Sequence, residues 1–146
     1  ACESLRAVEL LREMLRGSID TDTITYSAVT SACEKGHEWI KALQIVGLMS
    51  QRNIEINTIT YSALISACGN GHEWTMALEL LNVMSKLKIN ANAITYSSAI
   101  SACEKNGEWW KAFGLLDVML KESIEVGTIT CNAVISACEK GKRPER

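Results

Sequence analysis

The chain repeats its own sequence with a period of 35 residues. The pentapeptide ITYSA occurs at residues 24–28 and 59–63, and the variants ITYSS and ITCNA occur at residues 94–98 and 129–133. The same step relates Cys33, Cys68, Cys103 and Cys138, then Trp39, Trp74 and Trp109, then Ala42, Ala77 and Ala112, and then Met49, Met84 and Met119. A fixed period of this length is typical of stacked supersecondary units rather than of one closed globule.

Aligning the repeats divides the chain into three complete units with a half unit at each end. The complete units are residues 23–57, 58–92 and 93–127, the preceding half unit is residues 1–22, and the following one is residues 128–146. The preceding piece matches the second half of a complete unit, because Ala7 lies 35 residues before Ala42. Since the chain starts and stops within a unit, we expect it to be a fragment of a longer array.

Each unit has the hydrophobic pattern of two consecutive helices. In the first complete unit, one apolar stripe at helical spacing contains Ile24, Ala28, Val29, Ala32 and Cys33, and a second contains Trp39, Ala42, Leu43, Val46 and Met49. Gly36 separates the two stripes, and the only proline is Pro144, so nothing interrupts either helix. The pattern predicts an all-α chain of helix–turn–helix hairpins, with helices of about 12 and 14 residues.

The predicted helix ends carry suitable capping residues. Asp22, Asn57 and Asn92 precede the first helices of the three complete units and could cap their N-termini. Gly36 and Gly71 follow the first helices. We expect these glycines to end the helices in the left-handed conformation.

The composition permits an ordered core and counts against several function classes. The chain is 47% hydrophobic with a mean hydropathy of +0.05, so wholesale disorder is not expected. Its apolar runs are too short to span a bilayer. A net charge of −2 and a pI of about 5.7 count against a tight nucleic-acid binder, although a few lysines on one face would matter more than the sum.

The cysteines indicate neither disulfides nor a metal site. Equivalent residues of stacked hairpins are about 10 Å apart if neighbouring helices pack at their usual distance, which exceeds the reach of a disulfide. No CxxC or Cys/His cluster has zinc spacing, and no nucleophile–base pair or phosphate-binding loop is present. We interpret the repeated cysteines as buried apolar residues in a reducing compartment, and we expect no enzymatic activity, metal or cofactor.

The period and the position of the tryptophan distinguish two families of helical repeats. The tetratricopeptide repeat has 34 residues and its Trp in the first helix, whereas here the period is 35 and Trp opens the second helix. The chain resembles the pentatricopeptide repeat family, in its 35-residue P type, over its whole length. The resemblance rests on the Thr-Tyr-Ser starts at residues 25–27, 60–62 and 95–97, on Cys33 and Lys35, and on Ala42, Leu43 and Met49.

This resemblance implies a right-handed α-solenoid whose first helices line the concave face. It also implies binding of single-stranded RNA at one base per repeat. The family context implies a factor that processes or expresses RNA in an organelle, with the chloroplast favoured over the mitochondrion. A module of three complete repeats would cover about three bases and bind weakly alone, because a base stacked even on an aromatic platform contributes only about 1–3 kcal/mol.

The resemblance also assigns roles to particular positions. The residue after the tyrosine contacts the base edge and the last residue of the unit assists it, which gives Ser27, Asn57, Ser62, Asn92, Ser97, Gly127 and Asn132. A Ser paired with Asn favours adenine, so the first two complete units would read adenine, whereas Gly127 leaves the third open. The second residue of each unit wedges against the bases, which gives Ile24, Ile59, Ile94 and Ile129. A phosphate-facing lysine recurs at Lys35, Lys105 and Lys140, and Asn70 interrupts this series.

Each of these positions also has a purely structural interpretation. The asparagines could be helix caps and nothing more. The serines could be solvated residues of a first turn, and the isoleucines could pack between repeats. The lysines follow Glu34, Glu104 and Glu139, so they could belong to solvated helix ends of mixed charge.

A second function is open at this point, namely an architectural scaffold that binds protein subunits of a large organelle assembly such as a ribosome or a photosynthetic or respiratory complex. The acidic balance, Asn70 and Gly127 favour it. The Trp109–Trp110 pair favours it too, because Trp110 lies about 100° around the helix from Trp109. By helical phase we expect Trp109 to point into the hairpin and Trp110 to lie on its flank. An exposed Trp there would suit a protein contact, although Trp110 could instead pack between repeats. Neither function needs a membrane span or a small-molecule substrate.

Overall fold

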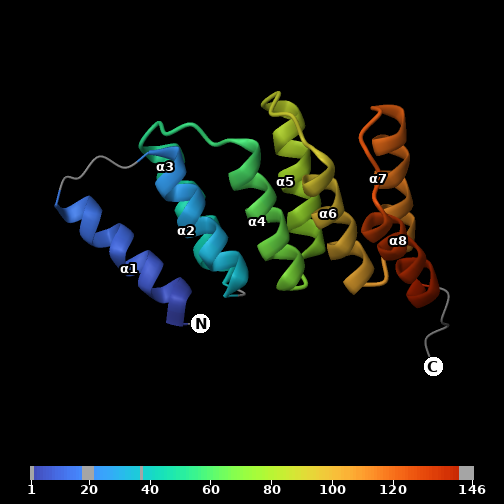
Figure 1. Ribbon diagram of the computed structural model, residues 1–146, viewed down its shortest axis with the longest axis horizontal. Helices are drawn as coiled ribbons and strands as arrows, with labels where there is room; N and C mark the ends of the chain where they lie inside the picture. The colour runs from blue at the N-terminus through green and yellow to red at the C-terminus, as the bar shows by residue number, and fades with distance from the viewer. Residues whose placement is uncertain (1, 18–21, 37, 142–146) are drawn as a thin grey trace.

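A computed structural model describes residues 2–17, 22–36 and 38–141, and these residues form α-helices without any strand (Figure 1). The helices are α1 (Cys2–Arg16), α2 (Thr23–Lys35), α3 (Trp39–Gln51), α4 (Thr58–Asn70), α5 (Trp74–Lys86), α6 (Ala93–Lys105), α7 (Trp109–Lys121) and α8 (Thr128–Gly141). The prediction of an all-α solenoid of helix hairpins is confirmed. Helices α2 to α7 have 13 residues each, rather than alternating between about 12 and 14.

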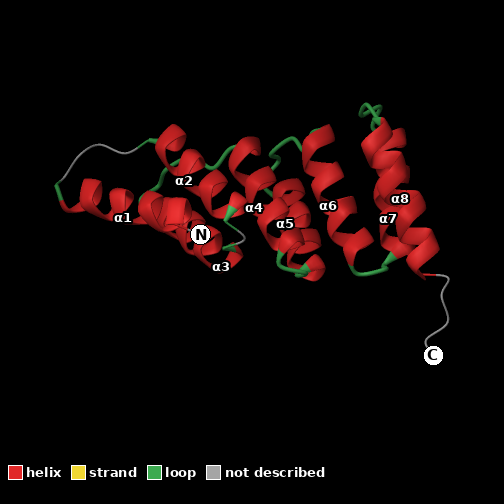
Figure 2. Ribbon diagram, turned by 60° about the horizontal axis from the view of Figure 1, so that its bottom comes forward, coloured by secondary structure: helices red, strands yellow, loops and turns green. Residues whose placement is uncertain are grey.

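The helices form two layers, and only in one of them do successive helices touch each other. The first helices α2, α4, α6 and α8 each contact the next one along the array. The second helices α3, α5 and α7 each contact the first helices on both sides, but within the described residues they do not contact one another. Figure 2 shows α2 and α4 above α3 and α5. Because only the first-helix layer is continuous, it forms the inner side of the array.

The repeated apolar residues fill the space between the layers. Tyr26, Tyr61 and Tyr96 are at most 8% exposed, and the side chains of Cys33, Cys68, Cys103, Ala42, Ala77, Ala112, Met49, Met84 and Met119 are fully buried. Each cluster draws on neighbouring units, since Leu64 and Ala67 of α4 pack with Tyr26 and Ala42 of the preceding hairpin. A single unit therefore cannot bury its apolar face without its neighbours.

Burial is confirmed for Cys33, Cys68 and Cys103, whereas the fourth repeated cysteine, Cys138, is only partly buried. Cys33, Cys68 and Cys103 are free thiols with no exposed surface. Burial, with a smaller contribution from Glu73 beside Cys68 and from Glu108 beside Cys103, raises the pKa of each of these two thiols to about 11. These thiols therefore behave as small apolar residues of the core.

The predicted N-caps are also confirmed. Oδ1 of Asp22, of Asn57 and of Asn92 accepts a hydrogen bond of 3.0 Å from the backbone N–H of Thr25, Thr60 and Thr95, respectively. Each cap residue has an extended backbone, as an N-cap requires. The three first helices therefore begin at equivalent positions, 35 residues apart.

The expected left-handed conformation of Gly36 and Gly71 is wrong, because their φ angles are −83° and −84°. In the turns after α4 and α6 the left-handed residue is the second one, His72 with φ of 62° and Gly107 with φ of 69°. Gly71 is small for another reason: a Cβ at this position would overlap Cδ1 of Trp39 in the preceding hairpin. The glycine at this end of the helix therefore permits a close approach between units rather than an unusual backbone angle.

The tryptophans at the start of the second helices are not equally buried. Trp39 and Trp74 are partly buried against the core, whereas Trp109 is 43% exposed and its ring lies edge-on to Phe113, with centroids 6.3 Å apart. The expectation that Trp109 points into its hairpin is therefore wrong, because its ring is exposed and lies beside Gly141 of α8. No helix among the described residues is both long and apolar enough to cross a membrane.

Candidate functional site

A row of exposed isoleucines marks the inner layer. Ile24, Ile59, Ile94 and Ile129 are 78%, 65%, 67% and 80% exposed, and each is the second residue of α2, α4, α6 or α8. Packing between repeats would have buried them, so that interpretation is wrong. An apolar side chain exposed at the same place in every unit is a feature that folding alone does not require.

Two of the serines that follow the tyrosines are buried rather than solvated, so that alternative is wrong for them as well. Ser27 and Ser62 are each 8% exposed. Oγ of Ser27 lies 2.6 Å from Oγ1 of Thr60, and Oγ of Ser62 lies 2.7 Å from Oγ1 of Thr95. Each serine is thus hydrogen-bonded to the threonine at the third position of the next unit.

The same threonines reach the cap residues. Oγ1 of Thr60 donates to Oδ1 of Asn57 at 3.1 Å, and Oγ1 of Thr95 donates to Oδ1 of Asn92 at 3.0 Å. The structure therefore links the two residues of each predicted base-reading pair through one threonine: Ser27–Thr60–Asn57 and Ser62–Thr95–Asn92. Each asparagine is a helix cap and also a member of this cluster.

The third unit lacks one member of the cluster. Oγ of Ser97 lies 2.6 Å from Oγ1 of Thr130, as in the other units. Gly127 stands where the asparagine would be, so no side-chain oxygen is offered to Thr130 from that position. Asn132, in the final half unit, is exposed on α8.

Two grooves open on this layer, and both contain predicted site residues. A groove of about 200 Å³ is lined by Ser62 and Asn92, with Ile59 and Ile94 also in its wall. The next groove is larger, about 720 Å³, and its lining residues include Ser97 and Gly127 with Ile94 and Ile129. The glycines at 69 and 127 both line the larger groove, and their missing side chains widen it. Each groove thus places polar side chains between two exposed isoleucines.

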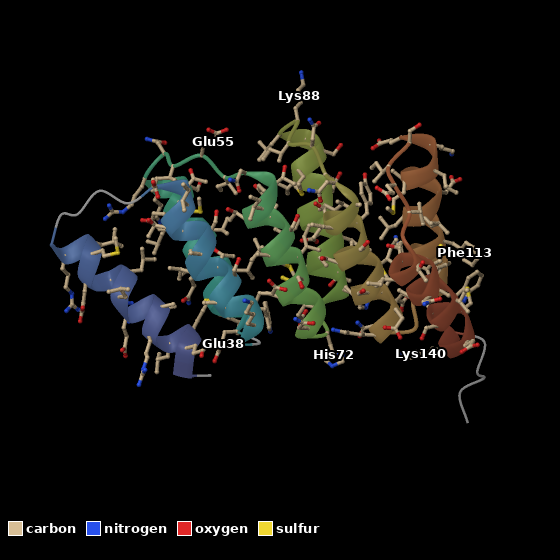
Figure 3. The ribbon with its side chains drawn as sticks, viewed as in Figure 1. Glu38, Glu55, His72, Lys88, Phe113 and Lys140 are labelled. Atoms are coloured by element: carbon tan, nitrogen blue, oxygen red, sulfur yellow. The ribbon has the colours of Figure 1, made fainter. Side chains whose placement is uncertain are left out.

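The predicted lysines lie at the far end of the first helices. Lys35, Lys105 and Lys140 are exposed, and Lys140 lies along the same edge of the array as His72, opposite the edge that carries Glu55 and Lys88 (Figure 3). Two of these lysines reach back to the preceding unit. Lys105 donates to Oδ1 of Asn70 at 2.6 Å, and Lys140 pairs with Glu104. Their ammonium groups are therefore held near the inner layer rather than fully solvated.

Glu104 is stabilised in its ionised form by its neighbours. Partial burial alone would raise its pKa, but hydrogen bonds from Lys140 and from the hydroxyl of Ser136 lower the pKa below its ordinary value. Glu34 accepts an equivalent bond from Ser66 at 2.8 Å. Gly69 replaces this glutamate in the middle unit, so α4 offers neither the carboxylate nor the lysine there.

The predictions from the sequence did not include the threonines that connect these residues. Thr60, Thr95 and Thr130 are at most 3% exposed, yet their hydroxyls are the centre of each cluster. The available signal was a hydroxyl residue at the third position of every unit, including Thr25. Within the described part of the chain, no three His, Cys, Asp or Glu side chains gather as a metal site would require.

The fold and these clusters define the chain as an array of helical hairpins with a polar, isoleucine-flanked inner layer. A family model described as the pentatricopeptide repeat domain matches residues 9–71 and 49–106, and one described as the PPR repeat matches residues 94–124. The chain belongs to the pentatricopeptide repeat family. The comparison with curated proteins gave no match.

Several solved structures share the fold. The pentatricopeptide domain of Arabidopsis thaliana protein-only RNase P 1, in complex with tRNA, aligns with a TM-score of 0.83 and 16% identity, over 95% of this chain and 74% of that one. The maize pentatricopeptide repeat protein PPR10, in complex with an 18-nt psaJ RNA element, aligns with a TM-score of 0.77 and 19% identity, over 95% of this chain and 22% of that one. A. thaliana nuclear proteinaceous RNase P 2 aligns with a TM-score of 0.80 and 12% identity, over 92% and 31%. At these identities the likeness establishes the fold alone.

Proposed function

We propose that this chain is a single-stranded RNA-binding module in which each complete unit binds one base on the inner layer. The observation that carries the proposal is the groove in which Ser62 and Asn92 lie between Ile59 and Ile94. Two of the similar structures are complexes with RNA, one with tRNA and one with an 18-nt element, which supports the same use of this fold here.

In this proposal the exposed isoleucines hold the plane of a base and the polar pair contacts its edge. An aliphatic wedge should contribute at or below the low end of the roughly 1–3 kcal/mol of an aromatic platform. Ser27 with Asn57, and Ser62 with Asn92, favour adenine. The third unit has no side chain at Gly127 and therefore a weaker preference.

The lysines supply the salt-sensitive part of binding. Lys35, Lys105 and Lys140 would bind the phosphates, and added salt weakens each of these interactions and so lowers the affinity. Asn70 offers no charge in the second unit, but Lys105 reaches it and brings an ammonium group to the same place. With a net charge of −2, affinity depends on these few groups rather than on the protein as a whole.

The proposed cellular role rests on the family and not on the site. We infer that the chain serves an organelle factor that processes or expresses RNA, in the chloroplast or the mitochondrion. About three units contact about three bases, so we expect the three units to bind RNA weakly by themselves.

The test compares two isoleucines of one helix. Ile59→Ala removes a side chain that is 65% exposed, and we expect it to weaken binding of a fluorescent A-rich hexamer severalfold with little change in thermal stability. Ile65→Ala removes a fully buried side chain and should cost about 2–5 kcal/mol of folding stability. Binding is measured by fluorescence anisotropy at low salt, at a temperature where both variants are folded.

An unchanged affinity of Ile59→Ala, or no binding of A-rich or U-rich hexamers by the unmodified chain at millimolar concentration, would count against the proposal. Binding that does not weaken as salt rises would count against the role of the lysines. Ile65→Ala should bind normally while it stays folded, because its side chain does not reach the inner surface.

A second candidate function, a protein-binding scaffold, has one observation in its favour. Trp109, Trp110, Phe113 and Leu120 of α7 are 43%, 54%, 47% and 63% exposed. Large exposed aromatic side chains are enriched at protein–protein contacts. Native purification after nuclease treatment distinguishes the two functions, because a scaffold stays with a multisubunit complex and an RNA-bound protein is released.

A further inference from the structure

The direction of each hydrogen bond in the Ser–Thr–Asn clusters can be worked out from the donors. The backbone N–H of Thr60 lies 3.0 Å from Oδ1 of Asn57. A backbone N–H can only donate, so the side-chain atom that faces it must be the carbonyl oxygen and not the NH2 group. The amide of Asn57 is therefore oriented with its Nδ2 away from the helix start, and Asn92 is oriented in the same way by the backbone N–H of Thr95.

The threonine hydroxyl has a single proton to donate. Oγ1 of Thr60 also contacts Oδ1 of Asn57, at 3.1 Å, and that oxygen has no proton to give. The threonine must therefore donate its proton to the asparagine. In the 2.6 Å contact between Ser27 and Thr60, the serine is then the only remaining donor. The same argument applies to Ser62, Thr95 and Asn92.

On these grounds we propose that Thr60 and Thr95 are positioning residues that fix the hydrogen-bond polarity presented to RNA by the first two complete units. Because its proton is committed to the threonine, the serine offers a ligand only lone pairs. Because its oxygen is committed to the helix start, the asparagine offers only N–H donors. Each serine–asparagine pair therefore presents a hydrogen-bond acceptor from the serine beside a hydrogen-bond donor from the asparagine. The inference rests on the proposed RNA-binding function.

Adenine matches this order, since its N6–H group donates and the neighbouring ring nitrogen N1 accepts. Hypoxanthine has the same ring shape, but its O6 accepts and its N1–H donates. A hypoxanthine held in the same place between two isoleucines would face acceptor with acceptor and donor with donor. Water can partly replace the lost bonds in an open groove, so we expect the two mismatches of one unit together to lower the affinity about threefold, and those of the two units together about tenfold.

The third unit provides an internal control. Gly127 offers Thr130 no side-chain acceptor, so nothing fixes which of Ser97 and Thr130 donates in their 2.6 Å contact. This hydroxyl pair can reverse its direction to suit either base. Removal of the Thr130 hydroxyl should therefore leave the discrimination between the two bases unchanged.

The experiment measures the affinities of labelled hexamers of adenosine and of inosine by fluorescence anisotropy. The unmodified chain should prefer adenosine by about tenfold. The double variant Thr60→Val/Thr95→Val keeps the backbone N–H bonds and the side-chain shape but loses both hydroxyls, and its preference should fall to within about twofold. Thr130→Val should keep the full preference, and Thr60→Ser/Thr95→Ser, which restores the hydroxyls, should keep it too.

The outcomes separate this inference from the proposed function. If the unmodified chain binds neither hexamer, the proposed RNA-binding function fails and the inference fails with it. If it binds both equally, or if the double valine variant is folded by circular dichroism and still prefers adenosine about tenfold, RNA binding stands and the polarity inference is overturned. Should the double variant not fold, Thr60→Val alone carries the same comparison, with an expected preference of about threefold; an unchanged tenfold preference would overturn the inference.

Discussion

Three helices begin with the same hydrogen bond, but only one of the three acceptors can be titrated. Asp22 accepts from the backbone N–H and the hydroxyl of Thr25, both at 3.0 Å, and the backbone bond is the largest cause that lowers the pKa of Asp22. Asn57 and Asn92 make the equivalent bonds with a neutral amide. The start of α2 therefore depends on pH in a way that the starts of α4 and α6 do not.

We expect acid to weaken the cap of α2 selectively. A lowered pKa means that the stabilisation is present above the unfolded-state pKa and is lost as the pH falls through the folded-state pKa, that is, below about pH 4. The amide resonance of Thr25 should shift between pH 6 and pH 2.5, while that of Thr60 stays in place as long as the array is folded. Asp22→Asn should abolish the shift, and a shift that persists in this variant would contradict the assignment.

The cysteines should differ sharply in reactivity towards thiol reagents. Cys33, Cys68 and Cys103 are buried, and burial raises the pKa of each. Cys131 is exposed on α8. Because the thiolate is the reactive form and must be accessible, Cys131 should react with iodoacetamide at least about tenfold faster than the three buried thiols. Peptide mapping by mass spectrometry measures the rates, which should become equal in urea; equal rates in the native state would contradict the burial.

At the scale of the helix, the glycine that ends α4 has a steric purpose. A Cβ at Gly71 would overlap the ring of Trp39, so Gly71→Ala forces the indole to move and should cost about 1–3 kcal/mol of folding stability. Gly47 lies inside α3, where an added Cβ would have no neighbour within 4 Å. Gly47→Ala should therefore stabilise the chain, by about 0.5–1 kcal/mol.

Urea denaturation of the two variants gives the comparison. The sign of the effect should differ between them, although both replace glycine with alanine. If Gly71→Ala were as stable as Gly47→Ala, the contact between Trp39 and the following unit would not be close-packed. A loss caused by backbone strain is not expected, because φ of Gly71 is −84°.

The helices could largely be predicted from the sequence, whereas the reason for the glycines could not. Apolar spacing and the capping residues are local features, so the hairpins and the caps at Asp22, Asn57 and Asn92 followed from one unit at a time. The contact between Gly71 and Trp39 joins residues 32 positions apart. A glycine after a helix usually indicates a left-handed residue, and the local pattern does not reveal that a ring from the neighbouring hairpin lies above it.

The candidate site shows the same division between local and non-local information. The exposed isoleucines and the serine and asparagine positions were identified through the resemblance to a family. Their connection through Thr60 and Thr95 was not, because each bond crosses from one unit to the next over 33 residues. Spacing within a unit shows which residues recur, but contacts between units depend on how the hairpins are stacked.

For the whole molecule, the contacts between helices predict a gradient of local stability. Helices α4 and α6 each pack against first helices on both sides and against second helices, whereas α1, among the described helices, packs only against α2. Arrays of repeats gain stability from each interface with a neighbour. Hydrogen exchange monitored by mass spectrometry should therefore show the slowest exchange in α4 and α6 and the fastest in α1. Uniform protection along the chain would indicate one cooperative unit instead.

In the part of the chain that the structure describes, α3, α5 and α7 do not touch one another. This separation has a mechanical consequence. A bend that moves these three helices farther apart or closer together disrupts no helix–helix packing within their own layer. A change in spacing among α2, α4, α6 and α8 would separate packed side chains at every step. We therefore expect the array to bend easily but to resist stretching or compression along its inner layer. The distance between successive isoleucines then stays nearly constant while the array bends.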